Sequence, residues 1–323
     1  MTSTTPHPVR VAIIGGGQNC EHDVSLATAH AVATALPDGY EPLGLTIGRD
    51  GAWLGPDGQP LADGLAGALR LLRTCDVVFP AVHGPRGEDG TLAALCDLAQ
   101  LPYVGSGVRA GALAMDKATT KLIAKDLGIP VARSALATTA DGTPPLPLPL
   151  VVKPVAAGSS HGVTLVDTPD AYRPALAAAL ALDSRALVEE TLEGREIDIA
   201  VLQRADQTLV TSPALEILTA GRLFDTTLKY DGTAAFRIPA PLTSQEQSTL
   251  TRHATRLFRA LGCAGTARFD FFLTPSGFVL NEVNTAPGLT EHSQVPKMFA
   301  AAGSHYPQLL TELIDSALAT HRR

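Results

Sequence analysis

The first third of the chain alternates short apolar runs with alanine- and leucine-rich segments of helical length. The apolar runs lie at 11–16, 41–48, 75–84 and 101–107. Short apolar runs separated by stretches that suit helices are typical of βαβ units and a parallel sheet. The pattern therefore predicts an α/β domain from residue 10 to about residue 105.

The pattern changes at residues 137–150, a stretch rich in proline and turn-forming residues that precedes a new apolar strand. Beyond this connection, apolar and polar residues alternate with a period of two, which favours antiparallel strands. We expect an α+β region to follow the α/β domain. The expected strands lie at 186–192, 196–202, 267–273 and 277–284, and the expected helices lie near 172–182, 244–261 and 306–320.

Composition narrows the possible partners. Of the 323 residues, 18% are charged, and the formal net charge is -7. This balance lacks the basic patch that a nucleic-acid backbone requires, so we expect no nucleic-acid partner. Four cysteines lie far apart and match no zinc spacing, which indicates reduced thiols. No apolar run approaches the roughly 18 residues of a membrane span, so we expect no membrane partner and a soluble, cytoplasmic protein.

The first apolar run leads into a glycine loop and then a helix, an order that dinucleotide-binding folds share. Gly15 and Gly17 fit that fingerprint, but Cys20 occupies the place of its third glycine, which argues against a dinucleotide site. Glu21 follows at the start of the expected helix. It either complements the helix dipole, as acids in a first turn often do, or supplies a carboxylate to a site. This stretch alone leaves both interpretations open.

The last two apolar runs are expected to form a hairpin around Pro275-Ser276-Gly277, a three-residue loop with glycine at its left-handed position. In that register Thr274 pairs with Phe278, and Asp270 faces Glu282. Two carboxylates that face each other across strands repel unless a cation lies between them. The hairpin therefore predicts a cation-binding pair.

The same face of the hairpin carries further polar residues. Arg268 lies two residues before Asp270, and Asn284 lies two residues after Glu282, so the four side chains share one face. Carboxylate and amide oxygens suit a magnesium ion. A solvated network of arginine and carboxylates is the alternative, which we consider weaker because the opposite face is apolar. That apolar face consists of Phe269, Phe271, Val279 and Val283.

A magnesium site of this kind usually also holds nucleotide phosphates, so phosphate-binding groups are expected elsewhere. Lys153 ends an apolar strand directly before a Gly/Ser-rich loop, whose backbone N–H groups can surround phosphate oxygens. Lys117 and Lys229 are further candidate cations. Most Gly/Ser-rich loops are plain turns and exposed lysines rarely need a role, so these residues are candidates for a phosphate-binding site.

Nine short motifs occur in order: GGGQNCEHDVSL, HGPRGEDGT, PYVGSG, MDKATTK, VVKPVAAGSSHGV, GREIDIAV, KYDG, ARFDFFL and NEVNTAPGLTEHS. This series resembles the D-alanine:D-alanine ligases of the ATP-grasp superfamily, from about residue 10 to residue 318. The resemblance implies a parallel-sheet α/β domain at 1–110 that binds substrate. A two-domain ATP-grasp fold would follow, with a central subdomain at 111–190 and a C-terminal subdomain at 191–323.

The resemblance also implies an activity. The enzyme would join two D-alanines into D-alanyl-D-alanine through an acylphosphate, converting ATP to ADP and supplying peptidoglycan precursor synthesis. ATP and two magnesium ions are the implied cofactors, with manganese as a substitute, and a homodimer is the implied assembly. Glu21 resembles the carboxylate that receives the ammonium group of the first D-alanine. The alternative is a ligase of the same fold that joins other small amino acids in specialised metabolism or antibiotic self-resistance.

The resemblance further assigns roles to individual residues. The implied catalytic residues are Glu21, Ser159, Tyr230, Arg268 and Gly288, and the implied metal ligands are Asp270, Glu282 and Asn284. The implied ATP-binding residues are Lys117, Lys153, Ser160, Glu189, Leu192, Glu196 and Lys229. The implied substrate-binding residues are Glu21, His83, Arg268, Ser293 and Gln294.

Some positions depart from the family pattern. Glu291 and Gln294 flank Ser293 at places where many relatives carry serine and an apolar or basic residue. Both lie beside the pocket implied for the second amino acid, so they bear on its identity. The other departures are Asn19-Cys20, Ala156-Ala157 and His161.

Overall fold

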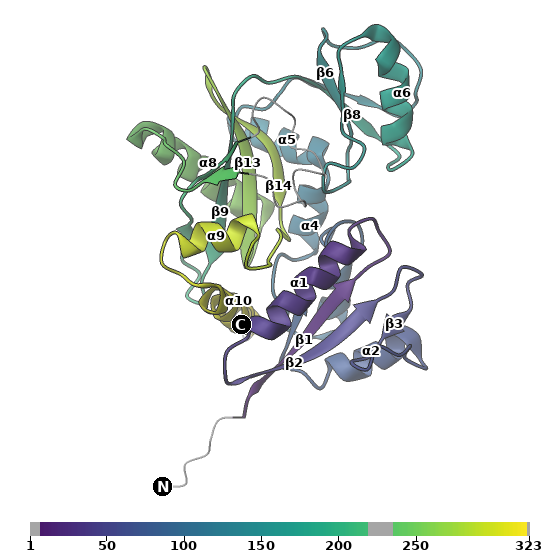
Figure 1. Ribbon diagram of the computed structural model, residues 1–323, viewed down its shortest axis with the longest axis vertical. Coiled ribbons are helices and arrows are strands. Elements are labelled where there is room, and N and C mark those ends of the chain that lie inside the picture. Colours follow the sequence, from purple (N-terminus) through teal and green to yellow (C-terminus); the bar gives the residue numbers. More distant parts are fainter. Residues whose placement is uncertain (1–6, 219–234, 322–323) are drawn as a thin grey trace.

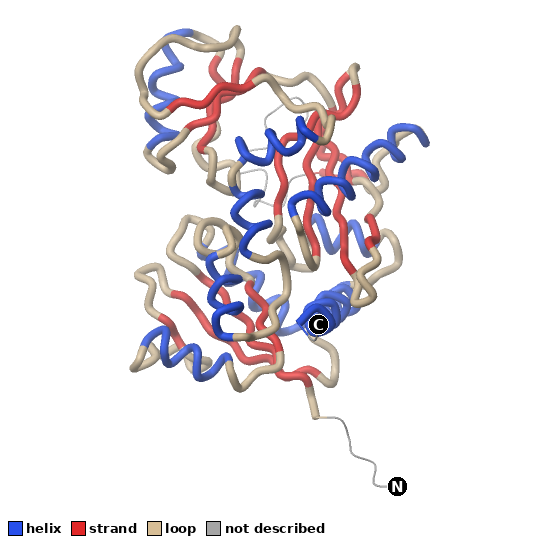
Figure 2. The backbone as a smooth tube through the Cα atoms, turned by 180° about the vertical axis from the view of Figure 1, so that it is seen from behind, coloured by secondary structure: helices blue, strands red, loops and turns tan. Residues whose placement is uncertain are grey.

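The computed structural model describes residues 7–218 and 235–321, and the strands within these ranges form three sheets. Figure 1 shows the N-terminal sheet at the bottom, the middle sheet at the upper right and the C-terminal sheet to its left. Figure 2 shows from behind the helices that cover these sheets. The α/β and α+β organisation expected from the apolar pattern is confirmed.

The N-terminal sheet consists of β1 (Val9–Gly16), β2 (Tyr40–Ile47), β3 (Trp53–Leu54) and β4 (Val77–Pro80), with helices α1 (His22–Ala35), α2 (Gly64–Leu72) and α3 (Thr91–Ala99). As predicted, β1 pairs with β2 and β4 in parallel, and β3 adds an antiparallel edge. The apolar run at 101–107 forms only a bridge between Tyr103 and Val78. Pro102 has no N–H with which to extend that ladder.

The middle sheet is antiparallel, in the order β5-β8-β6-β7. Its helix begins at Pro169, three residues before the expected start, because proline suits the first turn of a helix. Apolar side chains of the helix and the sheet, among them Leu176 and Val152, form a separate core. The elements are β5 (Ser134–Ala137), β6 (Leu150–Pro154), β7 (Thr164–Val166), α6 (Pro169–Leu180) and β8 (Ala186–Glu190).

The C-terminal sheet has the order β12-β11-β9-β13-β14, with β10 paired to β9. The expected strands at 196–202, 267–273 and 277–284 all lie in it, and α8 coincides with the helix expected at 244–261. Its elements are β9 (Arg195–Gln203), β10 (Leu209–Thr211), β11 (Leu215–Leu218), β12 (Ala235–Arg237), α8 (Ser244–Leu261), β13 (Thr266–Thr274) and β14 (Gly277–Asn284).

Helices from other parts of the chain join the sheets. α4 (Val108–Met115) and α5 (Lys117–Asp126) pack against β14 and α8, so their buried residues share one core with the C-terminal sheet. α9 (Gln294–Ala300) and α10 (Tyr306–His321) share another core with the N-terminal sheet. The division of the chain at residues 110 and 190 stays a prediction.

We predict that Thr243→Ala lowers the free energy of unfolding by about 1 kcal/mol. Thr243 caps α8: its hydroxyl accepts a hydrogen bond from the Glu246 N–H at 3.2 Å, and its own N–H donates to Glu246 Oε2 at 2.7 Å. Thermal and urea unfolding measure the loss. Ser248→Ala, an exposed position within α8, is the control and should cost nothing because alanine favours helices. Equal stability of the two variants would contradict the capping role.

Candidate active site

A cavity of about 1040 Å³ separates the middle sheet from the C-terminal sheet. Strands β6 and β8 form one wall, strands β9, β13 and β14 form the opposite wall, and α5 contributes two lysines. A cavity of this size holds a nucleotide-sized ligand. Among the residues singled out in the sequence, it is lined by Lys117, Lys153, Ser160, Glu189, Leu192, Glu196, Arg268, Asp270 and Glu282.

The hairpin at the base of the cavity places Asp270 opposite Glu282, as predicted, but its turn and its register near the turn differ from the predicted ones. The predicted three-residue loop is wrong: Thr274 pairs with Gly277, which leaves a two-residue turn. That turn shifts the register by one residue. A β-bulge at Asn281 shifts it back, because one extra residue on β14 restores the original pairing beyond it.

The bulge changes which side chains face the cavity. Asn281 and Glu282 are consecutive, yet both line it. Val279 was expected on the apolar face with Phe271, but it pairs with Phe272, which lines the cavity. That expectation is therefore wrong, because residues paired across strands share a face and the bulge lies between Val279 and Glu282.

Three carboxylates form a row across adjacent strands of the C-terminal sheet. Asp270 on β13 pairs with Asp198 on β9 and with Glu282 on β14. The Arg268 guanidinium contacts both Asp270 oxygens, at 2.7 and 2.8 Å, and lies 3.6 Å from Asp198. Burial alone would lower the pKa of Arg268, but Asp270 and Asp198 outweigh it and raise that pKa further. Arg268 therefore stays charged within the row.

Asn284 completes this polar face, as the sequence predicts. Its Nδ2 donates to Asp270 Oδ2 at 2.9 Å, and its partner across the hairpin is Arg268. Within residues 7–218 and 235–321, no group of three or more His, Cys, Asp or Glu side chains is arranged to hold a metal ion. A cation here would depend on two carboxylates and the Asn284 amide.

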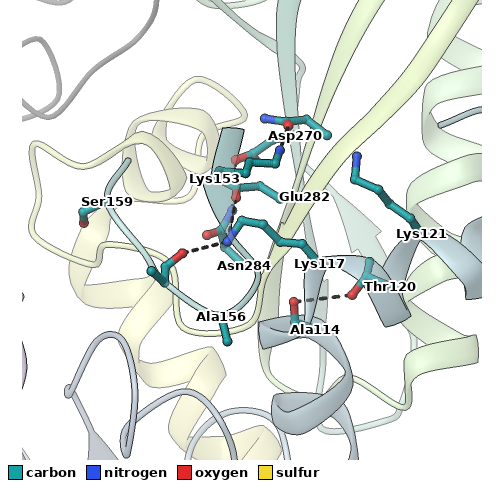
Figure 3. A network of polar contacts seen from close by, with 12 residues as sticks. Ala114, Lys117, Thr120, Lys121, Lys153, Ala156, Ser159, Asp270, Glu282 and Asn284 are labelled. Atoms are coloured by element: carbon teal, nitrogen blue, oxygen red, sulfur yellow. Dashed lines mark hydrogen bonds and ion pairs between the residues drawn. The ribbon is translucent and has the colours of Figure 1, made fainter. Parts of the chain in front are cut away.

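Three buried lysines, Lys117, Lys121 and Lys153, lie around the hairpin that carries Asp270 and Glu282 (Figure 3). Lys117 Nζ donates to the Ala157 carbonyl at 2.7 Å and lies 3.4 Å from Glu282. Lys153 Nζ lies 2.6 Å from Glu189. The sequence analysis missed Lys121, although it lies four residues after Lys117 and so shares its helix face.

Glu21 lies at the junction of the N-terminal sheet and the Gly/Ser-rich loop. Its Oε1 accepts a hydrogen bond from Ser159 Oγ, so the structure brings these two candidate residues together. Its Oε2 is buried and has no hydrogen-bond partner within the described part of the chain. A Cβ at Gly84 or Gly158 would approach that oxygen to 2.5 Å. Glycine at both positions therefore keeps the space beside the carboxylate open.

His83 connects the N-terminal domain to the loop that follows β14. The carbonyl of Ala286 can only accept, so His83 Nδ1 carries the proton and donates to it at 2.9 Å. His83 Nε2 then accepts from the Thr28 hydroxyl, also at 2.9 Å. Burial lowers the pKa of His83, which favours this neutral form. A direct contact with a substrate would require one of these hydrogen bonds to open.

The loop after β14 contains the remaining candidates. Ser293 Oγ accepts from the Thr290 N–H at 3.1 Å, and a Cβ at Gly288 would approach it to 3.0 Å. Gln294 begins α9 and donates through Nε2 to Asp198 Oδ2 at 2.9 Å. The loop is thereby tied to the row of carboxylates. Lys229 and Tyr230 lie outside the described residues.

Glu88 is a further residue that the sequence analysis missed, although it belongs to the motif HGPRGEDGT. It lines a small cavity together with Lys117 and Glu282. Burial and the Glu21 carboxylate raise the pKa of Glu88 to about 8, against the opposing effect of Lys117. This shift favours the protonated, uncharged form of Glu88 at neutral pH.

Two family profiles match the chain: one described as D-ala D-ala ligase N-terminus over residues 10–106, and one described as D-ala D-ala ligase C-terminus over residues 125–315. A D-alanine–D-alanine ligase A of Mesorhizobium japonicum is 40% identical, over 97% of this chain and 98% of the relative. A D-alanine–D-alanine ligase of Mycolicibacterium paratuberculosis is 37% identical, over 96% of this chain and 97% of the relative.

Solved structures that resemble this chain are ligases of the same kind as these relatives. The D-alanine-D-alanine ligase from Coxiella burnetii matches with a TM-score of 0.83 and 30% identity, over 98% of this chain and 95% of that chain. The VanG D-Ala:D-Ser ligase from Enterococcus faecalis matches with a TM-score of 0.81 and 32% identity, over 96% and 99%. The fold and its cleft thus define an ATP-grasp enzyme. The chain belongs to the D-alanine–D-alanine ligase family.

No helix in the described ranges combines the length and apolar character that crossing a membrane would require.

We predict that Glu88→Gln stabilises the protein increasingly as the pH rises from about 5 to about 8. The folded-state pKa of Glu88, about 8, lies above its ordinary value of 4.5. The folded state therefore holds more protons than the unfolded state in this window, and the wild type loses stability as the pH rises through it. Glutamine cannot lose a proton, so the variant avoids that loss.

Melting temperatures of both proteins between pH 5 and pH 8.5 measure the difference. Glu193→Gln, at an exposed position, is the control, and its difference from the wild type should not vary with pH. A constant difference for Glu88→Gln would show that the wild-type Glu88 is charged throughout.

Proposed function

We propose that this protein joins two D-alanine molecules into D-alanyl-D-alanine, converting ATP to ADP and phosphate. The main structural support is the cleft between the middle and C-terminal sheets, which buried lysines line together with Asp270 and Glu282. Membership in the D-alanine–D-alanine ligase family supports D-alanine as the substrate. The product would supply peptidoglycan precursor synthesis. We further propose a homodimer in the cytoplasm.

Glu21 is suited to hold the ammonium group of the first D-alanine. Its buried Oε2 has no hydrogen-bond partner in the described part of the chain, and Ser159 holds the other oxygen. A buried carboxylate gains much from a cationic donor, because hydrogen bonds between charged groups are the strong ones. The carboxylate of the bound D-alanine would then point toward the lysines.

The reaction proceeds in two steps. The carboxylate of the first D-alanine attacks the γ-phosphorus of ATP and releases ADP, which gives an acylphosphate. The amine of the second D-alanine then attacks the acyl carbon, and phosphate leaves. Lys117 and Lys153 neutralise charge on the phosphates, so the catalytic contribution is mainly positioning and electrostatic stabilisation.

The tetrahedral centre formed in the second step carries a developing oxyanion. Arg268 is held in a fixed orientation by Asp270, and Gly288 contributes a backbone N–H from the loop after β14. Donors that are already oriented stabilise such an oxyanion without reorganisation. In this proposal Ser293 binds the carboxylate of the second D-alanine. The roles assigned to Lys229 and Tyr230, which include closing the site against water, are part of this proposal.

Magnesium fits the donors that the hairpin supplies. Asp270, Glu282 and the amide oxygen of Asn284 are hard oxygen ligands, of the kind that bind magnesium together with phosphates. The cation would neutralise charge on the transferring phosphoryl group. We propose two such ions, with manganese as a substitute. Lys117 and Arg268, which now compensate these carboxylates, would then turn partly toward the substrates.

A second candidate is a ligase that accepts a polar second amino acid. Gln294 brings a side-chain amide beside Ser293, and Asp198 holds that amide in place. The amide oxygen of Gln294 is able to accept a hydrogen bond from a hydroxyl group. The VanG relative, named a D-Ala:D-Ser ligase, has the same fold. D-Serine is therefore the acceptor to test against D-alanine.

We predict that D-alanine is the preferred partner in both positions. The purified protein is incubated with ATP, magnesium and single or paired amino acids, including D-serine and L-alanine, with D-lactate as a hydroxy-acid acceptor. ADP release and product mass are measured together. D-Alanyl-D-alanine as the main product supports the proposal. A main product of D-alanyl-D-serine would favour the second candidate, and ADP release without any dipeptide would contradict both.

We predict that Glu282→Gln lowers turnover on the order of 100-fold and raises the magnesium concentration needed for half-maximal rate. The substitution removes one of two facing acids while keeping its shape, so the apo fold should persist. A magnesium titration of the rate and a melting curve measure both effects. Glu41→Gln, at an exposed position on β2, is the control. An unchanged rate at limiting magnesium would contradict the assignment of Glu282 as a metal ligand.

A further inference from the structure

Lys121 is a buried lysine to which the mechanism above gives no role. Only 3% of its surface is exposed, and it lies on α5, one helical turn after Lys117. Its Nζ lies 2.8 Å from Glu189 Oε1 and donates to the Leu280 carbonyl at 3.2 Å. Lysine is almost never buried so fully unless it is paired. Its position between α5, β8 and β14 therefore needs an explanation.

Glu189 lies between two ammonium groups. Lys121 contacts Oε1, and Lys153 contacts Oε2 at 2.6 Å. Burial alone would favour the neutral acid, but the two lysines outweigh it and lower the pKa of Glu189. One carboxylate thus has two counter-ions, which is one more than its charge requires.

The two lysines are held differently. Lys121 is anchored to the main chain of β14 through Leu280, so its position follows the sheet. Lys153 contacts side chains, Glu189 and Asn281, and the Asn281 contact is 3.1 Å long. Side-chain partners can rotate, whereas the β14 carbonyl cannot. Of the two lysines, Lys153 is therefore the one that is able to exchange its partner.

We propose that Lys121 is a positioning residue, the permanent counter-ion of Glu189, which allows Lys153 to leave that carboxylate and bind a nucleotide phosphate. The inference rests on the proposed function, in which Lys153 binds the phosphates of ATP. Without Lys121, departure of Lys153 would leave Glu189 as a buried charge with no counter-ion. A buried ionic pair that loses one partner is strongly destabilised. Lys153 would then stay with Glu189, and phosphate would bind weakly.

Because Lys121 acts through Lys153, its loss should weaken binding of the nucleotide phosphates but not of the base and ribose. In Lys121→Met, binding of ADP in the presence of magnesium should weaken at least tenfold, whereas binding of adenosine should change less than threefold. Isothermal titration at pH 7 measures both dissociation constants. A merely structural defect in the cavity would weaken adenosine and ADP alike, and that result would overturn the proposal.

A second variant separates charge from hydrogen bonding. Lys121→Gln keeps a donor for the Leu280 carbonyl but has no charge, so it should show the same selective loss of ADP binding. Recovery of ADP binding in this variant would overturn the proposal. Lys125→Met removes an exposed lysine one turn further along α5 and should bind ADP as the wild type does.

The double variant Lys121→Met with Glu189→Gln tests the exchange itself and avoids a buried unpaired charge if the single variant fails to fold. Glu189 is itself among the implied ATP-binding residues and lines the cavity, so the double variant is compared with Glu189→Gln alone. Lys153 has no carboxylate to neutralise in either protein, so their dissociation constants for ADP should agree within threefold. A further tenfold loss of ADP binding on adding Lys121→Met to Glu189→Gln would overturn the proposal.

Measurements on the wild-type protein distinguish a failure of this inference from a failure of the proposed function. A wild-type chain that binds no adenine nucleotide would overturn both. A wild-type chain that binds ADP and forms a dipeptide, with Lys121→Met binding ADP equally well, would overturn the inference alone.

Discussion

Compensation of buried charge is the constraint on which the rest of the cleft depends. A carboxylate that loses its partner in a buried pair costs about 3–5 kcal/mol, so the strands that carry the acids are stable only where cations reach them. These cations come from separate elements: α5, β6 and β13. The carboxylates are Asp198, Glu189, Asp270 and Glu282, and the cations that compensate them are Lys117, Lys121, Lys153 and Arg268.

The same ion pairs connect the sheets. α5 packs against β14, yet its Lys121 reaches Glu189 on the middle sheet. Lys153 extends from the middle sheet to Asn281 in the bulge of β14. A nucleotide that enters the cavity would therefore contact these polar groups. In the proposed function ATP binds together with magnesium. A ligand that carries both phosphate and cation could replace such contacts without leaving a charge unpaired.

Sequence reasoning was strongest where local rules decide the structure. The period of two located β13 and β14, and the facing pair Asp270 and Glu282 followed from counting residues across a hairpin. The loop length was nevertheless wrong, and the bulge at Asn281 compensated for it. The extra residue of the bulge, Asn281, accepts a hydrogen bond from Lys153 of the middle sheet. Alternation along one strand cannot reveal a partner that lies 128 positions away.

The residues missed in the sequence share this dependence on distant partners. Lys121, Asp198 and Glu88 stand within motifs that were recognised, but the groups they meet lie on other elements. Lys121 contacts Glu189 on β8, and Asp198 lies beside Arg268 on β13. Asp198 is fully buried beside Arg268, in a strand whose apolar alternation alone would have placed it on a polar face. His83 shows the converse, since the sequence identified it as a site residue while the structure engages both its ring nitrogens. Its hydrogen bond to the Ala286 carbonyl connects the N-terminal domain, which carries Glu21, to the loop that contains Gly288. Because this bond joins segments 203 positions apart, His83 has a structural role whether or not it contacts a substrate.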